Sequence, residues 1–397
     1  MKKYLVYLHR WLGFPLGLLF VVVFGTGLIS AFEEMLSRVD FAGPEYQYRE
    51  TTIAQDADAL AAITGGRDGI RQVVMPTEKT PYYQVDMRGE TFTYAIDDLK
   101  QVQHEQLESG GFFRTALQLH RNFLLGREEF LGISGKSYVA WTGLIALLLS
   151  VLGLWLWWPM RKSFRAKDLV PQGRQRRNFY YAHLTGGVVT LVAVILLGVT
   201  GAAITYRPLA KQVLGVDQPH AAKTLQHKNE QRKNGQQKTV SQTPEVLEVG
   251  WHAWLTAARA EIPGAELTRI RFPRPSSSEP VIEFRFRATG DWLGLANSKV
   301  RINTEHSTLV EVSRFEEQSL GEKLYSIIVP LHSGRGLHIG YLLVLLVFSL
   351  LGTLMVFSGL VSFLVKRRKI AIPGFRALNA RGIPPSRFQT ADNQITD

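Results

Sequence analysis

Four long stretches of the chain contain no charged side chain, and polar segments separate them. The stretches are Trp11–Phe32, Tyr138–Trp158, Leu184–Tyr206 and Ile339–Val365. A transmembrane helix needs about 20 mostly apolar residues, and each stretch reaches that length. The pattern therefore predicts a membrane protein that is mainly α-helical and has four transmembrane helices.

The two long polar segments share a second pattern, a helix-like stretch followed by runs of alternating polarity. The helix-like stretches are Thr52–Ile63 and Val246–Glu261. The alternating runs are Ile70–Met75, Tyr82–Met87 and Glu90–Ile96 in the first segment, and Leu267–Phe272, Val281–Arg287 and Val300–Thr304 in the second. A helix followed by strands of period two predicts a small α+β module in each segment.

These patterns divide the chain into eight parts. In order, they are the N-terminus with the first span (1–32), the first α+β module (33–137), the second span (138–159), a connector (160–182), the third span (183–206), a linker with the second α+β module (207–337), the fourth span (338–365) and a tail (366–397). Residues 217–243 are rich in Gln, Lys and Asn, which predicts a flexible linker before the second module.

The net charge of +12 is concentrated in three of these parts. Residues 1–10, 160–182 and 366–397 together hold 17 Lys and Arg and only three Asp. The positive-inside rule places such segments in the cytoplasm, so both termini are expected there and both modules on the other side of the membrane. The rest of the chain is slightly acidic, and we expect no basic patch and no nucleic-acid binding from it.

A histidine and a Thr-Gly pair recur with the same spacing in the first and third spans. His9 precedes Thr26-Gly27 by 17 and 18 residues, and His183 precedes Thr200-Gly201 by the same 17 and 18. At 1.5 Å per residue the spacing covers about 26 Å, most of a bilayer core. The repeat indicates an internal duplication.

A second pair of histidines precedes the second and fourth spans. His120 lies before the second span and His332 before the fourth, each predicted at the non-cytoplasmic end of that span. Two histidines from different helices at one depth can be the axial ligands of a b-type haem. We therefore expect two bis-histidine haem b sites, one formed by His9 and His183 and one by His120 and His332. His338 is an alternative to His332, and an interfacial histidine can also be a simple cap or anchor.

The absence of cysteine limits the metal chemistry. Thiolate clusters, disulfides and covalent haem attachment are excluded, so histidines must supply the ligands of any metal centre.

Glycines and arginines near these histidines are further candidates. Gly13 and Gly17 share the helical face of His9, and Gly187 shares that of His183, so each leaves room for a flat macrocycle. The alternative is that these glycines serve helix packing, and dimerisation through Gly13 and Gly17 stays open. Arg121 and Arg335 follow His120 and His332, where they are expected to pair with haem propionates or to be ordinary solvated charges.

The chain resembles the PepSY-associated transmembrane family, which includes bacterial iron-regulated membrane proteins and ferric-siderophore reductases. The likeness covers nearly the whole chain and rests on three motifs and on the second module, which is similar to a PepSY module. The motifs are Leu8-His9-Arg10-Trp11-Leu12-Gly13 with Thr26-Gly27, Leu119-His120-Arg121 with Leu124-Leu125-Gly126, and Leu331-His332-Ser333-Gly334. The family's usual Asp-Pro-x-Thr-Gly turn is missing from both modules.

The resemblance implies an oxidoreductase of the bacterial inner membrane, with periplasmic modules, that reduces ferric siderophores and so releases their iron. The electron donor is then a quinol or a cytoplasmic reductase. Two other functions fit the same sequence. One is a haem-free anchor whose modules bind peptides or inhibit a protease. The other is a siderophore permease, which is disfavoured because no span has a proline at its centre or a buried carboxylate.

Overall fold

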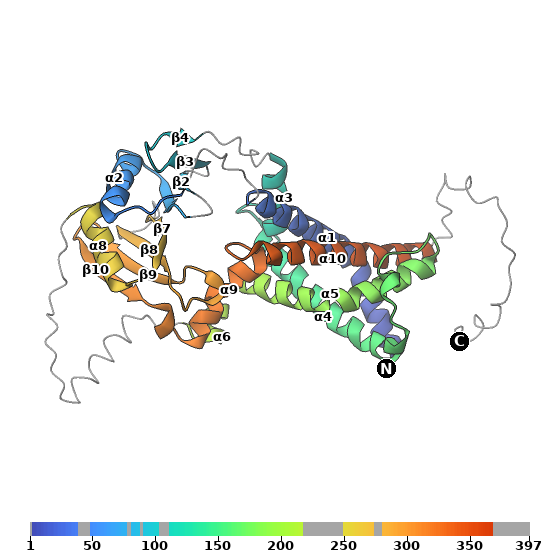
Figure 1. The fold of residues 1–397 in the computed structure, drawn as a ribbon. Coiled ribbons are helices and arrows are strands. Elements are labelled where there is room, and N and C mark those ends of the chain that lie inside the picture. Colours follow the sequence, from blue (N-terminus) through green and yellow to red (C-terminus); the bar gives the residue numbers. More distant parts are fainter. Residues whose placement is uncertain are drawn as a thin grey trace, which may run out of the picture.

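In the computed structural model, four long helices form a bundle and a separate β-sheet domain lies at one end of it (Figure 1). The structure describes residues 2–38, 48–77, 81–87, 90–102, 111–216, 249–273 and 280–367. The predicted linker at 217–243 and most of the predicted tail lie outside these residues.

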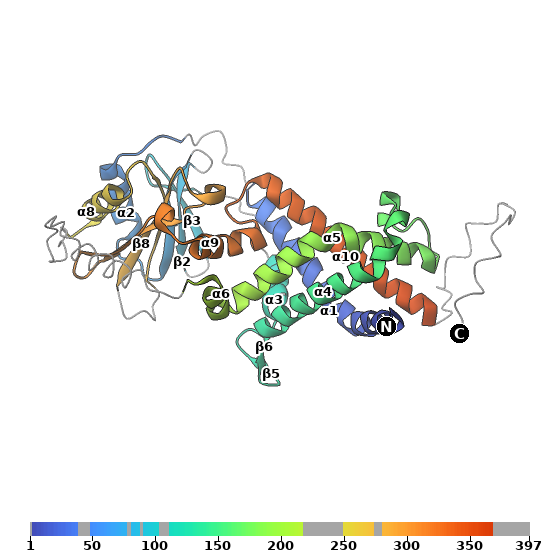
Figure 2. The ribbon, with the colours of Figure 1, turned by 90° about the horizontal axis from the view of Figure 1, so that it is seen from below.

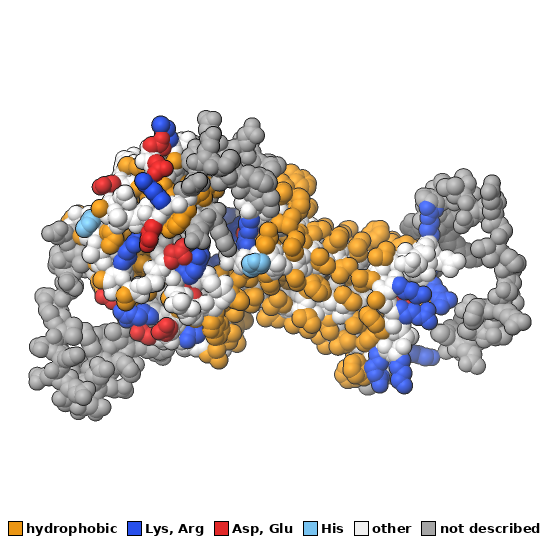
Figure 3. Space-filling model, in the orientation of Figure 1, with side chains coloured by type: hydrophobic (Ala, Val, Ile, Leu, Met, Phe, Trp, Pro, Cys, Tyr) orange, Lys and Arg blue, Asp and Glu red, His pale blue; other side chains and the backbone are white. Residues whose placement is uncertain are grey.

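The four helices of the bundle confirm the four predicted spans. They are α1 (Lys2–Leu36), α4 (Gly135–Trp157), α5 (Arg176–Thr205) and α10 (Ile339–Arg367), each long and apolar enough to cross a membrane. Helices α1 and α5 each pack against both α4 and α10. Hydrophobic side chains cover the outside of the bundle, and Lys and Arg gather at the end away from the sheet (Figure 3). The protein is therefore a membrane protein built on a four-helix core.

Small residues let the helices of the bundle approach each other closely. A Cβ atom on Gly17 of α1 would lie 2.6 Å from Leu360 of α10, and one on Gly198 of α5 would lie 3.2 Å from the Gly143 carbonyl oxygen of α4. Helices in a bilayer associate through van der Waals packing, which small residues favour.

The two polar segments form one antiparallel sheet rather than two separate modules. The first contributes α2 (Ile53–Thr64), β1 (Ile70–Val74), β2 (Tyr82–Met87), β3 (Glu90–Ala95) and β4 (Gln101–Val102). The second contributes α8 (Trp251–Glu261), β7 (Glu266–Arg271), β8 (Val281–Arg287), β9 (Ser298–Asn303) and β10 (Thr308–Ser313). The order β10-β9-β8-β7-β1-β2-β3-β4 is symmetric about the β1–β7 pair.

The pairing of β1 with β7 removes the exposed edge that each module would have alone. Val73 lies opposite Ile270 at the centre of this pair, and both side chains are fully buried. Helices α2 and α8 lie side by side on the same face of the sheet and close one hydrophobic core over it. Since an unpaired strand edge invites aggregation, the duplication gives a physical reason for the two modules to join.

Two amphipathic helices connect the sheet domain to the bundle. Helix α3 (Gly111–Asn122) precedes α4 and packs on α1, and α9 (Leu320–Ser333) precedes α10 and packs on α5. A hairpin of β5 (Glu129–Phe130) and β6 (Ile133–Ser134) leads from α3 into α4, and α6 (Arg207–Leu214) follows α5. The sequence pattern did not predict α3 and α9, although each half carries one in the same place.

Candidate functional site

His9 and His183 form the first histidine pair, at the end of the bundle away from the sheet. His9 comes from the first turns of α1 and His183 from those of α5. Their ring centroids are 6.1 Å apart, and the ring planes are inclined at 62°. We call this the N-terminal pair.

His120 and His332 form the second pair, at the end of the bundle next to the sheet. Their ring centroids are also 6.1 Å apart, with the planes inclined at 40°. Both histidines lie near the C-terminal ends of α3 and α9, the helices that precede the second and fourth spans. We call this the sheet-side pair.

The two pairs are separated by most of the length of α1 and α5. His120 reaches α1 at Thr26, and His332 reaches α5 at Thr200. Each threonine follows the histidine of the N-terminal pair on its own helix by 17 residues, so the pairs lie about 26 Å apart along the bundle. This is most of the thickness of a bilayer core.

The Nδ1 atoms of three of the four histidines are held by hydrogen bonds. Nδ1 of His120 donates to the Val23 carbonyl oxygen at 3.0 Å, and Nδ1 of His183 donates to that of Met355 at 2.9 Å. A neutral imidazole that donates from Nδ1 has its lone pair on Nε2, which is then available to a metal. Nδ1 of His9 is buried and makes no hydrogen bond with the described residues.

Thr200 fixes His332 in the same tautomer. Its hydroxyl donates to the Leu196 carbonyl oxygen at 2.6 Å, and it lies 3.0 Å from Nδ1 of His332. A hydroxyl has one proton, so the Thr200 oxygen accepts the proton of His332 Nδ1. Thr26 stands in the same relation to His120, at 3.4 Å. Thr26 and Thr200 therefore contact the histidines of the sheet-side pair, at the opposite end of their helices from His9 and His183.

Burial keeps the sheet-side pair neutral. It is the main cause that lowers the pKa of His120 and of His332 below the ordinary value of histidine. Both imidazoles are neutral at pH 7 as a result, and the neutral form is the one that binds metals.

Each histidine lies against a glycine of a neighbouring helix. The distances from a Cβ atom placed on that glycine to the nearest imidazole atom are short for Gly153 to His9 (3.2 Å), Gly359 to His183 (2.6 Å), Gly27 to His120 (3.2 Å) and Gly201 to His332 (3.0 Å). A side chain at any of these positions would push the imidazole away. The sequence indicated two of these glycines through the Thr-Gly repeat, and Gly153 and Gly359 were missed because nothing in their own segments marks them.

The glycines predicted to make room for a macrocycle differ in their surroundings. Around a Cβ atom placed on Gly13 or Gly187, no heavy atom lies within 4 Å, so both leave open space beside the N-terminal pair. Gly17 is packed against Leu360, which is the arrangement expected from the helix-packing alternative. Its role is to bring α1 and α10 together.

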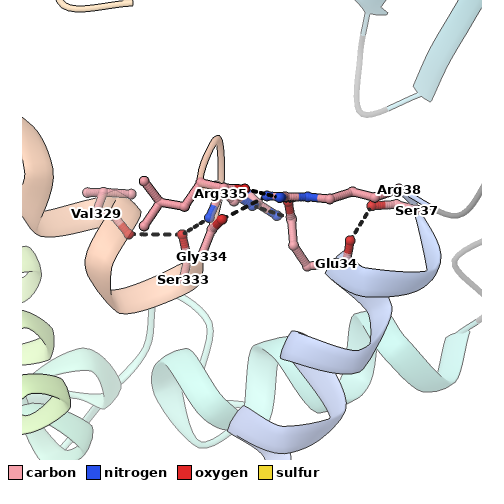
Figure 4. A network of polar contacts seen from close by, with 8 residues as sticks. Glu34, Ser37, Arg38, Val329, Ser333, Gly334 and Arg335 are labelled. Carbon is pink, nitrogen blue, oxygen red and sulfur yellow. Dashed lines mark hydrogen bonds and ion pairs between the residues drawn. The ribbon is translucent and has the colours of Figure 1, made fainter. Parts of the chain in front are cut away.

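Arg335 is engaged in a polar network that ties α1 to the turn between α9 and α10 (Figure 4). Its Nε donates to Glu34 at 3.1 Å, and Glu34 also pairs with Arg38 at 2.9 Å. Arg38 in turn donates to the carbonyl oxygen of Gly334 at 2.7 Å. Arg121 follows His120 directly, is exposed, and forms no ion pair with a carboxylate among the described residues. Of the two predicted propionate partners, Arg335 forms an ion pair with Glu34, whereas Arg121 forms none among the described residues and is influenced by the charge of Glu33.

The remaining described histidines lie apart from the pairs. His338 is exposed, and its Nδ1 accepts a hydrogen bond from the Gly340 backbone at the start of α10. His252 and His306 are exposed on the sheet domain, while His104, His220 and His227 lie outside the described residues. The structure thus brings His332, and not His338, to His120.

Both pairs have the separation expected for two imidazoles on opposite sides of one iron. An imidazole nitrogen binds a metal at about 2 Å, which puts the two ring centroids about 6 Å apart. No group of three or more His, Asp or Glu side chains gathers as a metal-ion site within the described ranges. Two histidines suffice for haem because the macrocycle supplies the other ligands. The residues present therefore fit a bis-histidine haem at each end.

A comparison with protein families gives the class of this four-helix protein. The model of the PepSY-associated TM region matches residues 6–366, so the chain belongs to this family. No curated protein matches the chain.

Proposed function

We propose that the protein carries electrons across a bacterial inner membrane through two b-type haems and reduces ferric siderophores in the periplasm. The observation that carries the proposal is the pair of matched sites, each with two imidazoles 6.1 Å apart, at opposite ends of the same two helices. Two redox centres separated along a bundle are what transfer from one face to the other requires.

The orientation follows from the charges at the ends of the bundle. The connector between α4 and α5 and the first residues of α1 are rich in Lys and Arg and lie away from the sheet (Figure 3). By the positive-inside rule this end faces the cytoplasm, and the sheet domain faces the periplasm. The N-terminal pair would then hold the haem nearer the electron donor, and the sheet-side pair would hold the haem nearer the periplasmic acceptor.

The protein's own residues hold and orient the site. The four histidines would hold the two haems, Nδ1 hydrogen bonds orient three of them, and the neighbouring glycines make room for the imidazole rings. A haem bound there would supply one-electron redox chemistry. A quinol or a cytoplasmic reductant loses that electron, and the ferric chelate gains it to become a ferrous chelate, which binds its iron more weakly.

The first test is spectroscopic. The purified chain is expected to show a reduced-minus-oxidised b-type spectrum with two haems per polypeptide. In liposomes that enclose dithionite, it is expected to reduce an external ferric siderophore, detected by a chromogenic chelator of Fe(II). Colourless protein from cells supplied with ample haem would contradict the proposal and favour the haem-free anchor.

A second prediction concerns Thr200. Replacing it with Val removes the acceptor of His332 Nδ1 and is expected to weaken haem binding at the sheet-side pair by about 10- to 100-fold, as for other partners that orient a metal ligand. The measurement is haem retention during dilution or competition with apomyoglobin. Thr190→Val is the matched control, because Thr190 is buried on the same helix and bonds only to Gly186. Equal retention by the two variants would show that Thr200 does not support the site.

A further inference from the structure

The face of the sheet that α2 and α8 leave uncovered carries a row of three cations. Arg269 on β7 lies opposite Arg285 on β8, which lies opposite Lys299 on β9. Their neighbours Ile270 and Phe284 are fully buried under the helices, so the cations point to the other face. We call these three residues the basic row. The chain outside the membrane flanks is slightly acidic in total, and a total charge does not reveal a local cluster of cations. The expectation that this part of the chain has no basic patch is therefore wrong.

Acidic residues on this face balance only part of the positive charge. Each of two glutamates is shared between two cations: Glu283 lies near Arg285 (2.6 Å) and Arg271 (3.7 Å), and Glu311 near Lys299 (2.8 Å) and Arg301 (3.0 Å). A further pair at the strand ends, Arg287 with Glu266, is balanced. Arg269 forms no ion pair within 4.0 Å among the described residues, and Asp86 is the carboxylate whose charge acts on it.

Arg269 is an unfavourable residue for the fold itself. Like charges directly opposite each other destabilise a sheet, and Nε of Arg269 is buried without a hydrogen-bond partner among the described residues. Burial and the nearby Arg285 and Arg287 lower its pKa from the ordinary value of arginine. Charged side chains that destabilise the fold around them in this way are typical of binding sites.

The other half of the duplicated sheet shows that the fold does not need the basic row. The β1–β2 and β7–β8 pairs have the same register, so Gln72 corresponds to Arg269 and Asp86 to Arg285. Gln72 donates to Asp86 at 2.8 Å, and Thr91 also donates to Asp86 at 2.8 Å. In the first half, the side chains at these positions form hydrogen bonds with one another. In the second half, the corresponding side chains are all cations and repel one another.

The basic row lies on the side of the sheet that is turned toward the bundle. In Figure 2, α2 and α8 lie at the end of the domain away from the bundle, and the strands β2, β3 and β8 lie between them and the helix α9. A ligand on the uncovered face is therefore on the same side as the sheet-side pair.

We propose that the basic row binds the ferric chelate as an anion, so that the acceptor is a siderophore whose iron complex carries net negative charge from carboxylate or catecholate groups. This inference rests on the proposed function. Arginine matches carboxylates with two parallel hydrogen bonds, and the excess charge attracts anions to this face. A cationic or neutral hydroxamate complex gains nothing from the row.

The test measures binding without reduction. The full chain in phosphatidylcholine nanodiscs is titrated calorimetrically with gallium(III) citrate, an anionic complex that cannot be reduced. Wild-type protein is expected to bind, and Arg269→Gln with Arg285→Gln to lower the affinity at least about tenfold, since each charged hydrogen bond contributes substantially. The matched control removes two cations from the first half, Arg49→Gln with Lys100→Gln, and is expected to leave affinity within about twofold because distant surface charges are screened.

Several outcomes would overturn the proposal. They are no binding by the wild type, equal affinity in the two double variants, and binding of metal-free citrate as tight as that of the gallium complex. Arg269→Gln alone removes a like-charge contact and should not lower the unfolding midpoint, and it serves if the double variant, which also breaks the Arg285–Glu283 ion pair, fails to fold. Haem plays no part in this readout, so colourless protein that binds gallium citrate would contradict the proposed function and leave the anion site standing.

Discussion

Replacing His332 with Ala is expected to remove about half of the b-type absorbance of the purified protein and to abolish reduction of external ferric chelate. His332 supplies one of two imidazoles at the sheet-side pair, while His9 on α1 and His183 on α5 lie about 26 Å away along the bundle and keep their contacts. His120→Ala is expected to give the same result. A double variant that lacks His9 and His120 is expected to be colourless, because each pair then has one ligand.

His338→Ala is the control for this prediction. His338 is exposed and bonds only to the backbone at the start of α10, so its removal is expected to leave the spectrum unchanged. Loss of absorbance in His338→Ala with full absorbance in His332→Ala would reverse the assignment of the sheet-side ligand. Full absorbance in both His120→Ala and His332→Ala would remove the second haem site.

The second large effect is expected on the stability of the sheet domain, at Asp56. This carboxylate is almost fully buried on α2 and accepts hydrogen bonds from Thr51 (2.8 Å), Tyr83 (2.9 Å) and Arg259 of α8 (2.7 Å). Burial and the neighbouring Asp56 raise the pKa of Tyr83, so its hydroxyl stays protonated and donates. Asp56 thus joins the two halves of the domain across their helices.

Asp56→Ala is expected to destabilise the sheet domain by about 3 kcal/mol, because it leaves the Arg259 charge and the Tyr83 hydroxyl without their partner. With the usual denaturant dependence of small domains, the urea midpoint is expected to fall by about 1–2 M. Fluorescence of Trp251 and Trp254 on α8 reports the transition in the detergent-solubilised chain. Asp98→Ala is the control, since Asp98 is exposed in its pair with Lys100 and no change of midpoint is expected. Equal midpoints for the two variants would show that Asp56 is not a structural anchor.

The two halves of the chain have diverged while keeping one plan. Both keep a histidine at the start of a span, a Thr-Gly pair at its end, and a histidine on an amphipathic helix. The sheet keeps the same register in both halves, yet only the second carries the basic row. A membrane core that stays symmetric and a sheet that does not are consistent with electron transfer through the core and recognition of one ligand by the sheet.

Much of this structure was predictable because it depends on local patterns. The strands Tyr82–Met87 and Val281–Arg287 were predicted with their observed bounds, since alternating burial leaves a clear period of two. Helices α3 and α9 were missed because each is short and amphipathic and lies directly before a long apolar span. The joining of the two modules was missed because strand pairing between distant parts of the chain leaves no local trace, and strand β10 was also not predicted.

The sequence by itself determined the four spans, the duplication and the four candidate histidines, because apolar length and repeat spacing are properties of the chain. Only the tertiary structure decided which histidines face each other, that Thr26 and Thr200 serve the opposite pair, and that Gly17 packs helices while Gly153 and Gly359 admit imidazoles. It also gathered Arg269, Arg285 and Lys299 into one row from three strands. The physical reason is that these relations are distances between side chains far apart in the sequence, and the packing of helices and the register of strands set them.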